Sequence, residues 1–339
     1  MTIAIAGKQQ SSRYGVLVGV LSVVVVALFF ASLAIGYAPL DIRQAVIDAL
    51  DGRPTLAALV LTELRLPRAL LGGLVGFSLG LTGAAMQGLM RNPLAEPGII
   101  GISGAAALGA VTTFYFWLAS ALSLALPLGG IVGALAATFL LFALAGRGVG
   151  TTKLILAGVT INSFAGALTA LALNLSPSPY AVSEIVFWLM GSFADRSLPY
   201  VFLAAPLMAF GWILLLVSGN ALDGLTLGED TATSLGFDLG RLRTQLVVGA
   251  AMAVGSAVAV SGAIGFVGLV APHVMRPLVD SQPSRLLLVS GFAGAVLTLT
   301  ADILVRLLPV SPELKLGVVT AIIGAPFLFS LIYRLKEEP

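Results

Sequence analysis

Residues 99–146 read IIGISGAAALGAVTTFYFWLASALSLALPLGGIVGALAATFLLFALAG and contain no Asp, Glu, Lys, Arg or His. Residues 244–272 form a second run that lacks all five of these side chains. A helix that crosses the hydrocarbon core of a bilayer needs about 20 mostly apolar residues, so each run can supply at least one crossing. These two runs predict an integral membrane protein.

The composition of the whole chain points the same way. Of its 339 residues 58% are hydrophobic and only 10% are charged, whereas soluble domains carry about 25% charged residues. A transmembrane β-barrel would alternate apolar and polar residues within segments of about ten residues, and no such alternation is present. The expected fold class is therefore all-α, with residues 1–339 forming a single transmembrane domain.

Several chemistries are disfavoured by the residues that are rare or missing. The chain has no cysteine and one histidine, which excludes thiolate metal sites and disulfides and leaves little for any metal centre. A net charge of +2 with scattered basic residues does not suggest nucleic-acid binding. We expect no covalently bound cofactor. No Walker A motif is present, so we expect any ATP to be hydrolysed by a separate partner and not by this chain.

Apolar runs between helix-breaking residues predict about ten crossings. An even number places both termini on the same side of the membrane. The first run, residues 16–37, exceeds the roughly 7–15 apolar residues of a signal peptide core, and we interpret it as a retained helix. The predicted spans lie near residues 15–37, 68–90, 99–118, 124–145, 154–174, 198–218, 244–261, 266–280, 285–306 and 315–333.

Positive charge predicts the orientation, because cytoplasmic loops carry an excess of Lys and Arg. With both termini in the cytoplasm, eleven basic residues fall at inner positions: Lys8, Arg13, Arg91, Arg147, Lys153, Arg241, Arg243, Arg276, Arg285, Arg334 and Lys336. Seven fall outside: Arg43, Arg53, Arg65, Arg68, Arg196, Arg306 and Lys315.

Three segments are too polar or too broken to span the membrane. Residues 38–67 contain a short amphipathic helix at 41–50, which we expect outside. Residues 177–196 open with Ser-Pro-Ser-Pro and are expected to form a short apolar helix at 184–193 near the outer surface. Residues 219–243 form the longest polar segment on the inner side.

Glycines recur at helix-packing intervals. Gly72, Gly76 and Gly80 are four residues apart, as are Gly129 and Gly133, and small residues allow helix backbones to approach closely within lipid. Gly262, Gly265 and Gly268 are expected at a tight outer turn. We interpret all of these glycines as packing residues.

The predicted span centres carry almost no ionisable residues, whereas ion-coupled carriers place acids or bases near the membrane midplane. Asp302 precedes Arg306 by four residues, which predicts a local ion pair. His273 is interpreted as a structural histidine at a helix end. Three classes stay open: a permease driven by a partner ATPase, an ion-coupled secondary transporter and a membrane scaffold.

The inner segment 219–243 is the best candidate for coupling to such an ATPase. Residues 227–243 should form two short helices separated near Gly236, with Glu229 and Asp230 opening the first one. The mixture of apolar and acidic residues suits a docking surface. The candidate coupling residues are Leu227, Gly228, Glu229, Asp230, Thr231, Ser234, Leu235 and Gly236.

Six short blocks carry a resemblance to a known family. They are LRLPR (64–68), MQ (86–87), RNPLAEPG (91–98), LGED (227–230), FVGLVAPH (266–273), and GVVTA (317–321) followed by GAP (324–326). In this order and spacing they resemble the permeases of iron–siderophore, haem and vitamin B12 ABC importers, the type II importer permeases of the FecCD type. The resemblance covers nearly the whole chain.

The resemblance implies an assembly in a bacterial inner membrane. It implies ten helices, a second permease subunit that is identical or homologous, two copies of a cytoplasmic ATPase, and an external binding protein, periplasmic or lipid-anchored. The cargo stays open among an iron–siderophore, haem and cobalamin.

The resemblance also implies roles for particular residues. Thr151 and Thr152 match the position of a cytoplasmic gate, and Asn92 and Leu94 match a second constriction. Arg65, Arg68 and Arg306 match arginines that pair with acidic residues of the binding protein, and guanidinium groups can hold a carboxylate through two parallel hydrogen bonds.

Overall fold

The computed structural model describes residues 2–37, 39–116, 124–146, 150–176, 178–310 and 312–337. Within these ranges the chain is helical and contains no β-strand. The α-helices are α1 (Thr2–Ala34), α2 (Ile42–Leu50), α3 (Leu56–Leu59), α4 (Leu66–Met90), α5 (Ile102–Tyr115), α7 (Ala125–Ala145), α8 (Thr151–Asn174), α9 (Pro179–Leu189), α10 (Leu198–Val217), α11 (Gly219–Leu225), α12 (Glu229–Ser234), α13 (Leu239–Ala250), α14 (Ser256–Ser261), α15 (Val267–Met275), α16 (Pro283–Leu307) and α17 (Leu316–Glu337).

Short turns of other helix types join some of these elements. A π-helical turn, Val60–Arg65, links α3 to α4, and a second, Ala251–Gly255, makes α13 and α14 one continuous rod. Two 3-10 turns, Pro97–Ile100 and Arg276–Val279, precede α5 and follow α15.

Seven helical rods in the described ranges are long and apolar enough to cross a membrane, and each overlaps one of the predicted spans. The other three predicted spans, 99–118, 266–280 and 315–333, coincide with shorter apolar helices over Ile102–Tyr115, Val267–Val279 and Leu316–Ser330. The multi-pass architecture is confirmed, while the count of ten crossings stays a prediction.

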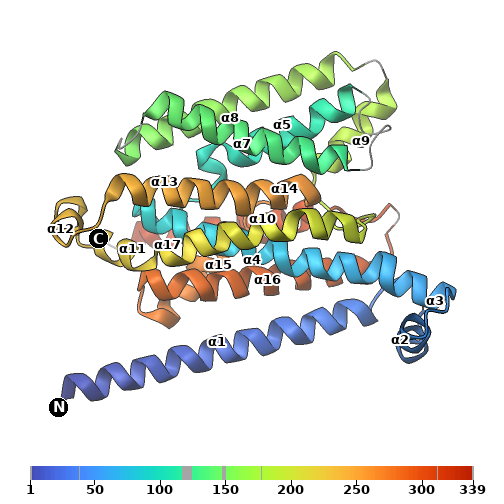
Figure 1. Ribbon diagram of the computed structural model, residues 1–339, viewed down its shortest axis with the longest axis horizontal. Helices are drawn as coiled ribbons and strands as arrows, with labels where there is room; N and C mark the ends of the chain where they lie inside the picture. Colours follow the sequence, from blue (N-terminus) through green and yellow to red (C-terminus); the bar gives the residue numbers. More distant parts are fainter. Residues whose placement is uncertain are drawn as a thin grey trace.

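The rods lie roughly along one axis (Figure 1). The start of α1, the end of α17 and the short helices α11 and α12 lie at one end of the bundle, and α2, α3 and α9 lie at the opposite end. We call these the α12 end and the α2 end. Both termini therefore share one end, as an even number of crossings requires.

The predicted glycine packing is present in the bundle core. Thr298 of α16 donates a hydrogen bond to the carbonyl oxygen of Gly72 on α4 at 2.7 Å. A Cβ atom added to Gly76 would collide with Thr298, and one added to Gly80 would collide with the Ser290 carbonyl oxygen. Gly129 and Gly133 of α7 pack against the backbone of α5 in the same way. Close contact between α4 and α16 therefore depends on these glycines.

The non-spanning helices at the α2 end differ in how well they were predicted. The helix expected at 41–50 is α2, and Asp41 caps it by accepting a hydrogen bond from the Gln44 N–H at 3.1 Å. The helix expected at 184–193 is α9, which begins and ends earlier than predicted. Ser178 and Pro179 start it, because proline is favoured in the first helical turn, and Gly191, with φ of 73°, follows its end.

Candidate functional sites at the two ends of the bundle

The candidate coupling segment lies at the α12 end and contains one of the two short helices predicted there. Glu229 and Asp230 occupy the first turn of α12, as expected. Gly236, with φ of 91°, ends the helix: its N–H bonds to the Thr233 carbonyl at 2.9 Å, and the Phe237 N–H bonds to the Ala232 carbonyl at 3.1 Å. This pair of hydrogen bonds is a Schellman motif, which favours glycine at that position.

The second helix after Gly236 is not short. Asp238 caps α13 by accepting a hydrogen bond from the Arg241 N–H at 3.0 Å, and α13 continues into α14 as one of the long rods. The prediction of a second short helix was wrong because the polar residues 238–243 are the first turns of an otherwise apolar rod.

Side chains on and around α12 are divided between anchors and exposed residues. Glu229 forms an ion pair with Arg243 of α13 at 2.7 Å, and Ala232 is fully buried. Leu227 and Leu235 are 64% and 59% exposed, and Asp230, Thr231 and Ser234 are also exposed. The segment thus presents two leucines and an acidic residue outward from a base that is fixed to α13.

Asp223 on α11 ties this end to α16, and the sequence analysis did not single it out. Its carboxylate accepts hydrogen bonds from the Ser284 N–H at 2.8 Å, the Ser284 hydroxyl at 2.6 Å and the Gln282 amide at 3.0 Å. Asp223 therefore caps the N-terminus of α16 from another helix. Only tertiary structure brings these residues together, so no local sequence signal was available.

The predicted gate residues lie on two neighbouring elements. Asn92 is exposed and its side-chain oxygen accepts a hydrogen bond from the Leu94 N–H at 2.9 Å, which makes a tight turn after α4. Thr151 and Thr152 are the first two residues of α8. The preceding residues 147–149, including Arg147, lie outside the described residues.

The loop that carries Asn92 and Leu94 continues into the turn Pro97–Ile100, which packs against α8 at Gly158. Gly158 is seven residues, about 10 Å of helix, from Thr151. The two segments that carry the candidate gate residues are thus in contact through this turn. Glu96, between them, is half-buried, and burial raises the pKa of its carboxyl group.

Two further polar residues make contacts between helices of the bundle. Gln87 of α4 is buried and accepts a hydrogen bond from Arg276 at 2.5 Å, which gives the glutamine of the MQ block a structural role. His273 lies in the last turn of α15, as predicted, and its ring packs edge-to-face against Phe327 of α17 at 5.2 Å.

At the α2 end, a buried ionic cluster joins α4, α16 and the segment before α17. Asp302, 2% exposed, forms ion pairs of 2.9 Å with both Arg68 and Arg306, which confirms the predicted Asp302–Arg306 pair. Arg68 also pairs with Glu313, whose side chain is 20% exposed.

Arg65 and Arg306 turn inward to the end of α1. Arg65 donates hydrogen bonds to the carbonyl oxygens of Leu33 and Ala34 at 2.9 and 2.8 Å. Arg306 donates to the carbonyl oxygens of Ser32 and Ile35 at 2.8 and 2.7 Å. The last carbonyl oxygens of a helix have no hydrogen-bond donor within that helix. At the end of α1, two guanidinium groups act as the missing donors.

The three arginines, which were expected to be available to a binding protein at the outer surface, are therefore largely buried. Arg65 and Arg306 are 5% and 6% exposed, and the Arg68 side chain is 12% exposed. Docking of a binding protein at these residues stays a prediction.

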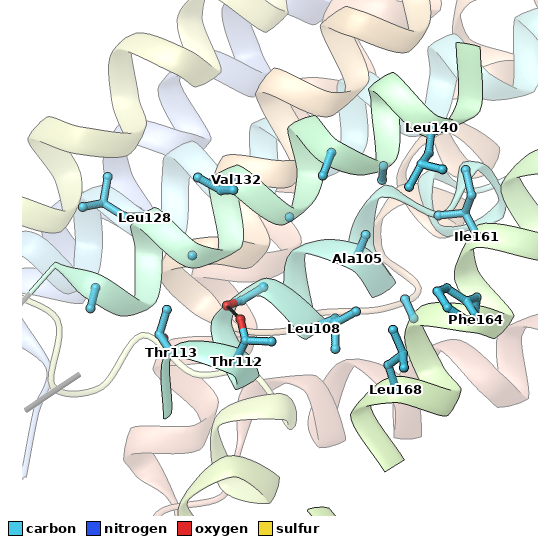
Figure 2. A pocket seen from close by; sticks show the side chains of 17 residues that line it. Ala105, Leu108, Thr112, Thr113, Leu128, Val132, Leu140, Ile161, Phe164 and Leu168 are labelled. Carbon is cyan, nitrogen blue, oxygen red and sulfur yellow. Dashed lines mark hydrogen bonds between the residues drawn. The ribbon is translucent and has the colours of Figure 1, made fainter. Parts of the chain in front are cut away.

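An apolar cavity of about 660 Å³ opens on one side of the bundle between α5, α7 and α8 (Figure 2). Leu128 and Val132 of α7, Leu108 of α5, and Phe164 and Leu168 of α8 are among the residues that line it. The hydroxyls of Thr112 and Thr113 are bonded to the carbonyls of Gly109 and Ala110 at 2.6 and 2.7 Å. The cavity therefore offers hydrocarbon surface and no charged group.

Seven membrane-length apolar helices with polar segments gathered at both ends define a polytopic membrane protein. Residues 24–334 match the FecCD transport family. The chain belongs to that family, and it is a transporter permease subunit and not an enzyme.

Individual relatives cover most of the chain. The vitamin B12 import system permease protein BtuC of Vibrio cholerae is 38% identical over 81% of this chain and 83% of its own length. The iron(3+)-hydroxamate import system permease protein FhuG of Bacillus subtilis is 33% identical over 96% of this chain and 99% of its own. A solved structure of a metal-chelate type ABC transporter in an inward-facing conformation superposes with a TM-score of 0.81 at 31% identity, covering 94% of this chain and 99% of that one.

Proposed function

We propose that this permease moves an iron chelate, haem or cobalamin into the cytoplasm of a bacterium, powered by a partner ATPase. The observation that carries the proposal is similarity along nearly the full length to permeases named for import of an iron(3+)-hydroxamate and of vitamin B12. In this proposal the chain crosses the inner membrane about ten times, and the three shorter apolar helices supply the crossings beyond the seven long ones. Both termini, and hence the α12 end, face the cytoplasm.

Two copies of the ATPase dock at the α12 ends of two permease subunits, identical or homologous. Leu227 and Leu235 are the exposed apolar side chains that such a partner would cover. The Glu229–Arg243 pair fixes α12 to α13, and Asp223 fixes α11 to α16, so a push on this segment reaches two long rods. ATP is used on the partner, and we propose no cofactor on this chain.

Thr151, Thr152, Asn92 and Leu94 form the cytoplasmic constriction of the path. The packing of the Pro97–Ile100 turn on α8 supports this assignment, because it makes the two gate segments move together.

The binding protein docks at the α2 end through Arg68. Of the three candidate arginines, Arg68 has a partner, Glu313, that lies on a connecting segment and is partly exposed. A carboxylate of the binding protein would replace Glu313 on the guanidinium group, whereas Arg65 and Arg306 hold α1 in place.

Reconstitution tests the proposal as a whole. Proteoliposomes that contain the permease, its ATPase and the cargo-loaded binding protein should take up a labelled hydroxamate siderophore, haem or cobalamin. This uptake should require ATP on the side of the membrane where the ATPase is bound. Uptake driven by a proton or sodium gradient without the ATPase would instead establish a secondary transporter, and no uptake of any of the three cargoes under either condition would refute import.

Docking is tested separately by two substitutions with opposite expected effects. Arg68→Gln should weaken binding of the loaded binding protein, most strongly at low salt, and Glu313→Gln should strengthen it by freeing Arg68. Arg53→Gln, which removes an exposed arginine at the same end, is the matched control. Equal binding by all three variants and the parent would show that docking lies elsewhere.

A further inference from the structure

A second groove, distinct from the cavity of Figure 2, lies between α7, α10 and α13 and has a volume of about 1140 Å³. All three helices contribute the part of their length nearest the α12 end. Phe139 and Phe142 come from α7, which ends at Ala145, and Phe210 and Leu214 come from α10, which ends at Val217. The groove therefore occupies one half of the bundle, next to the coupling segment.

One wall of the groove is apolar and open to the surroundings. Phe139 is 76% exposed and Phe210 is 51% exposed, and they lie on different helices. In a chain that spans a membrane, two exposed aromatic rings that flank a groove suit contact with hydrocarbon chains better than contact with water.

The other wall carries opposite charges at its end. Arg241 and Asp238 both line the groove and both are exposed. Arg243, on the same helix, is paired with Glu229, whereas no ion pair of Arg241 is present among the described residues. The Asp238 carboxylate accepts only a backbone N–H at 3.0 Å in the described contacts, so it keeps capacity for a further donor.

The length of the groove matches one leaflet of a bilayer. Its α13 wall extends from Asp238 to Val248, and ten residues of helix span about 15 Å. Half of a hydrocarbon core of about 30 Å is the same distance. The charged residues lie at the outermost end of this wall, Thr244 and Gln245 follow one turn further along it, and the phenylalanines lie alongside. The groove therefore suits a lipid with its headgroup at the α12 end.

We propose that this groove is a binding site for phosphatidylethanolamine. The lipid phosphate pairs with the Arg241 guanidinium group, its ammonium group donates to the Asp238 carboxylate, and an acyl chain lies between Phe139 and Phe210. The one cation and one anion of the groove complement the zwitterionic headgroup. An anionic headgroup would leave Asp238 facing a like charge, and a choline headgroup has no N–H to donate.

The site goes beyond the transport function and requires only that the chain is in a membrane. Its position next to α12 means that the lipid would contact α13, the helix that carries Arg243, the ion-pair partner of Glu229. The cavity of Figure 2, lined only by apolar and threonine side chains, supplies an internal comparison because it has no headgroup partner.

Native mass spectrometry on the full chain tests the proposal. The protein is released from nanodiscs that contain equal amounts of phosphatidylethanolamine, phosphatidylglycerol and phosphatidylcholine, and retained lipids are counted. We expect one phosphatidylethanolamine retained in preference to the others. Arg241→Gln should lower its retention about tenfold, which is the effect of losing one charge-assisted hydrogen bond.

Two variants keep the test free of folding artefacts. Asp238→Asn should lower the preference for phosphatidylethanolamine while it preserves the cap of α13, since asparagine caps helices as well as aspartate does. Arg43→Gln on α2 removes an exposed arginine at the opposite end and should change nothing. Equal retention of the three lipids by the parent, unchanged retention in both groove variants, or a preference for phosphatidylglycerol that only Arg241→Gln abolishes would each overturn the proposal.

Discussion

Replacing Asp302 with Asn removes the central negative charge of the cluster at the α2 end without changing side-chain shape. Asp302 is 2% exposed and contacts two guanidinium groups, those of Arg68 and Arg306, each at 2.9 Å. An amide oxygen can still accept a hydrogen bond from one of these arginines, but the amide NH₂ group must face the other. The substitution therefore breaks one of the two pairs outright and weakens the second.

The loss of folding free energy in Asp302→Asn depends on which partners the two arginines keep. Removing one member of a buried ion pair costs about 3–5 kcal/mol when the other charge is left alone. Here Arg68 keeps Glu313 and Arg306 keeps the carbonyl oxygens of Ser32 and Ile35. One or two charge-assisted hydrogen bonds are lost, so we expect the free energy of unfolding to fall by about 2–4 kcal/mol.

The measurement is reversible unfolding in mixed micelles with increasing dodecyl sulfate, followed by tryptophan fluorescence. Asp51→Asn is the matched control, because the Asp51–Arg53 pair at the same end is exposed and the same substitution should cost only about 0–1 kcal/mol. Hydrogen exchange near Ser32 should also quicken in Asp302→Asn. A loss no greater than that of the control, with unchanged exchange, would refute the view that this cluster holds α1.

Three further predictions concern the α12 end. Gly236→Ala should lower the free energy of unfolding by about 1–2 kcal/mol because position 236 has φ of 91°, and it should reduce co-purification of the ATPase while membrane insertion is unchanged. Gly73→Ala on α4, where an added Cβ meets no atom within 4 Å, is the control. Thr152→Cys in this cysteine-free chain should form a disulfide across two permease subunits if they are identical and should then block uptake, and failure to crosslink in every nucleotide state would place the constriction elsewhere. Burial raises the pKa of Glu96, so the folded state binds this proton more tightly than the unfolded chain does. Stability therefore falls as the pH rises from the unfolded-state pKa towards the raised folded-state pKa. Glu96→Gln should remove this pH dependence and raise the melting temperature at neutral pH, and a lower melting temperature would show that the carboxylate has a stabilising partner.

Hydropathy and helix-packing rules predicted the features that depend on local sequence. The long rods, the packing glycines between α4 and α16, the short helix at 41–50 and the pair between Asp302 and Arg306 all involve residues of one element or periodic positions along it. Each is decided by side-chain chemistry within a few residues, which is why the sequence sufficed.

Features that join distant elements were not predictable in this way. Arg65 and Arg306 were expected at the surface because of their position at span ends, but the free carbonyls of α1 lie within their reach. Asp223 was missed because its partners are about 60 residues away in the chain. The start of α13 was read as a short helix because its first turns are polar while the rest of the rod is buried.

The contacts of Arg306 with Ser32 have a consequence for biogenesis. These residues are 274 positions apart, and ribosomes deliver the N-terminal part of a chain first. When α1 enters the bilayer, Arg306 has not yet been synthesised, whereas Arg65, which binds the carbonyls of Leu33 and Ala34, lies only 32 and 31 positions further along the chain. The carbonyls of Ser32 and Ile35 therefore lack their guanidinium partner until α16 is inserted, and the closure of this part of the bundle is a late event in assembly.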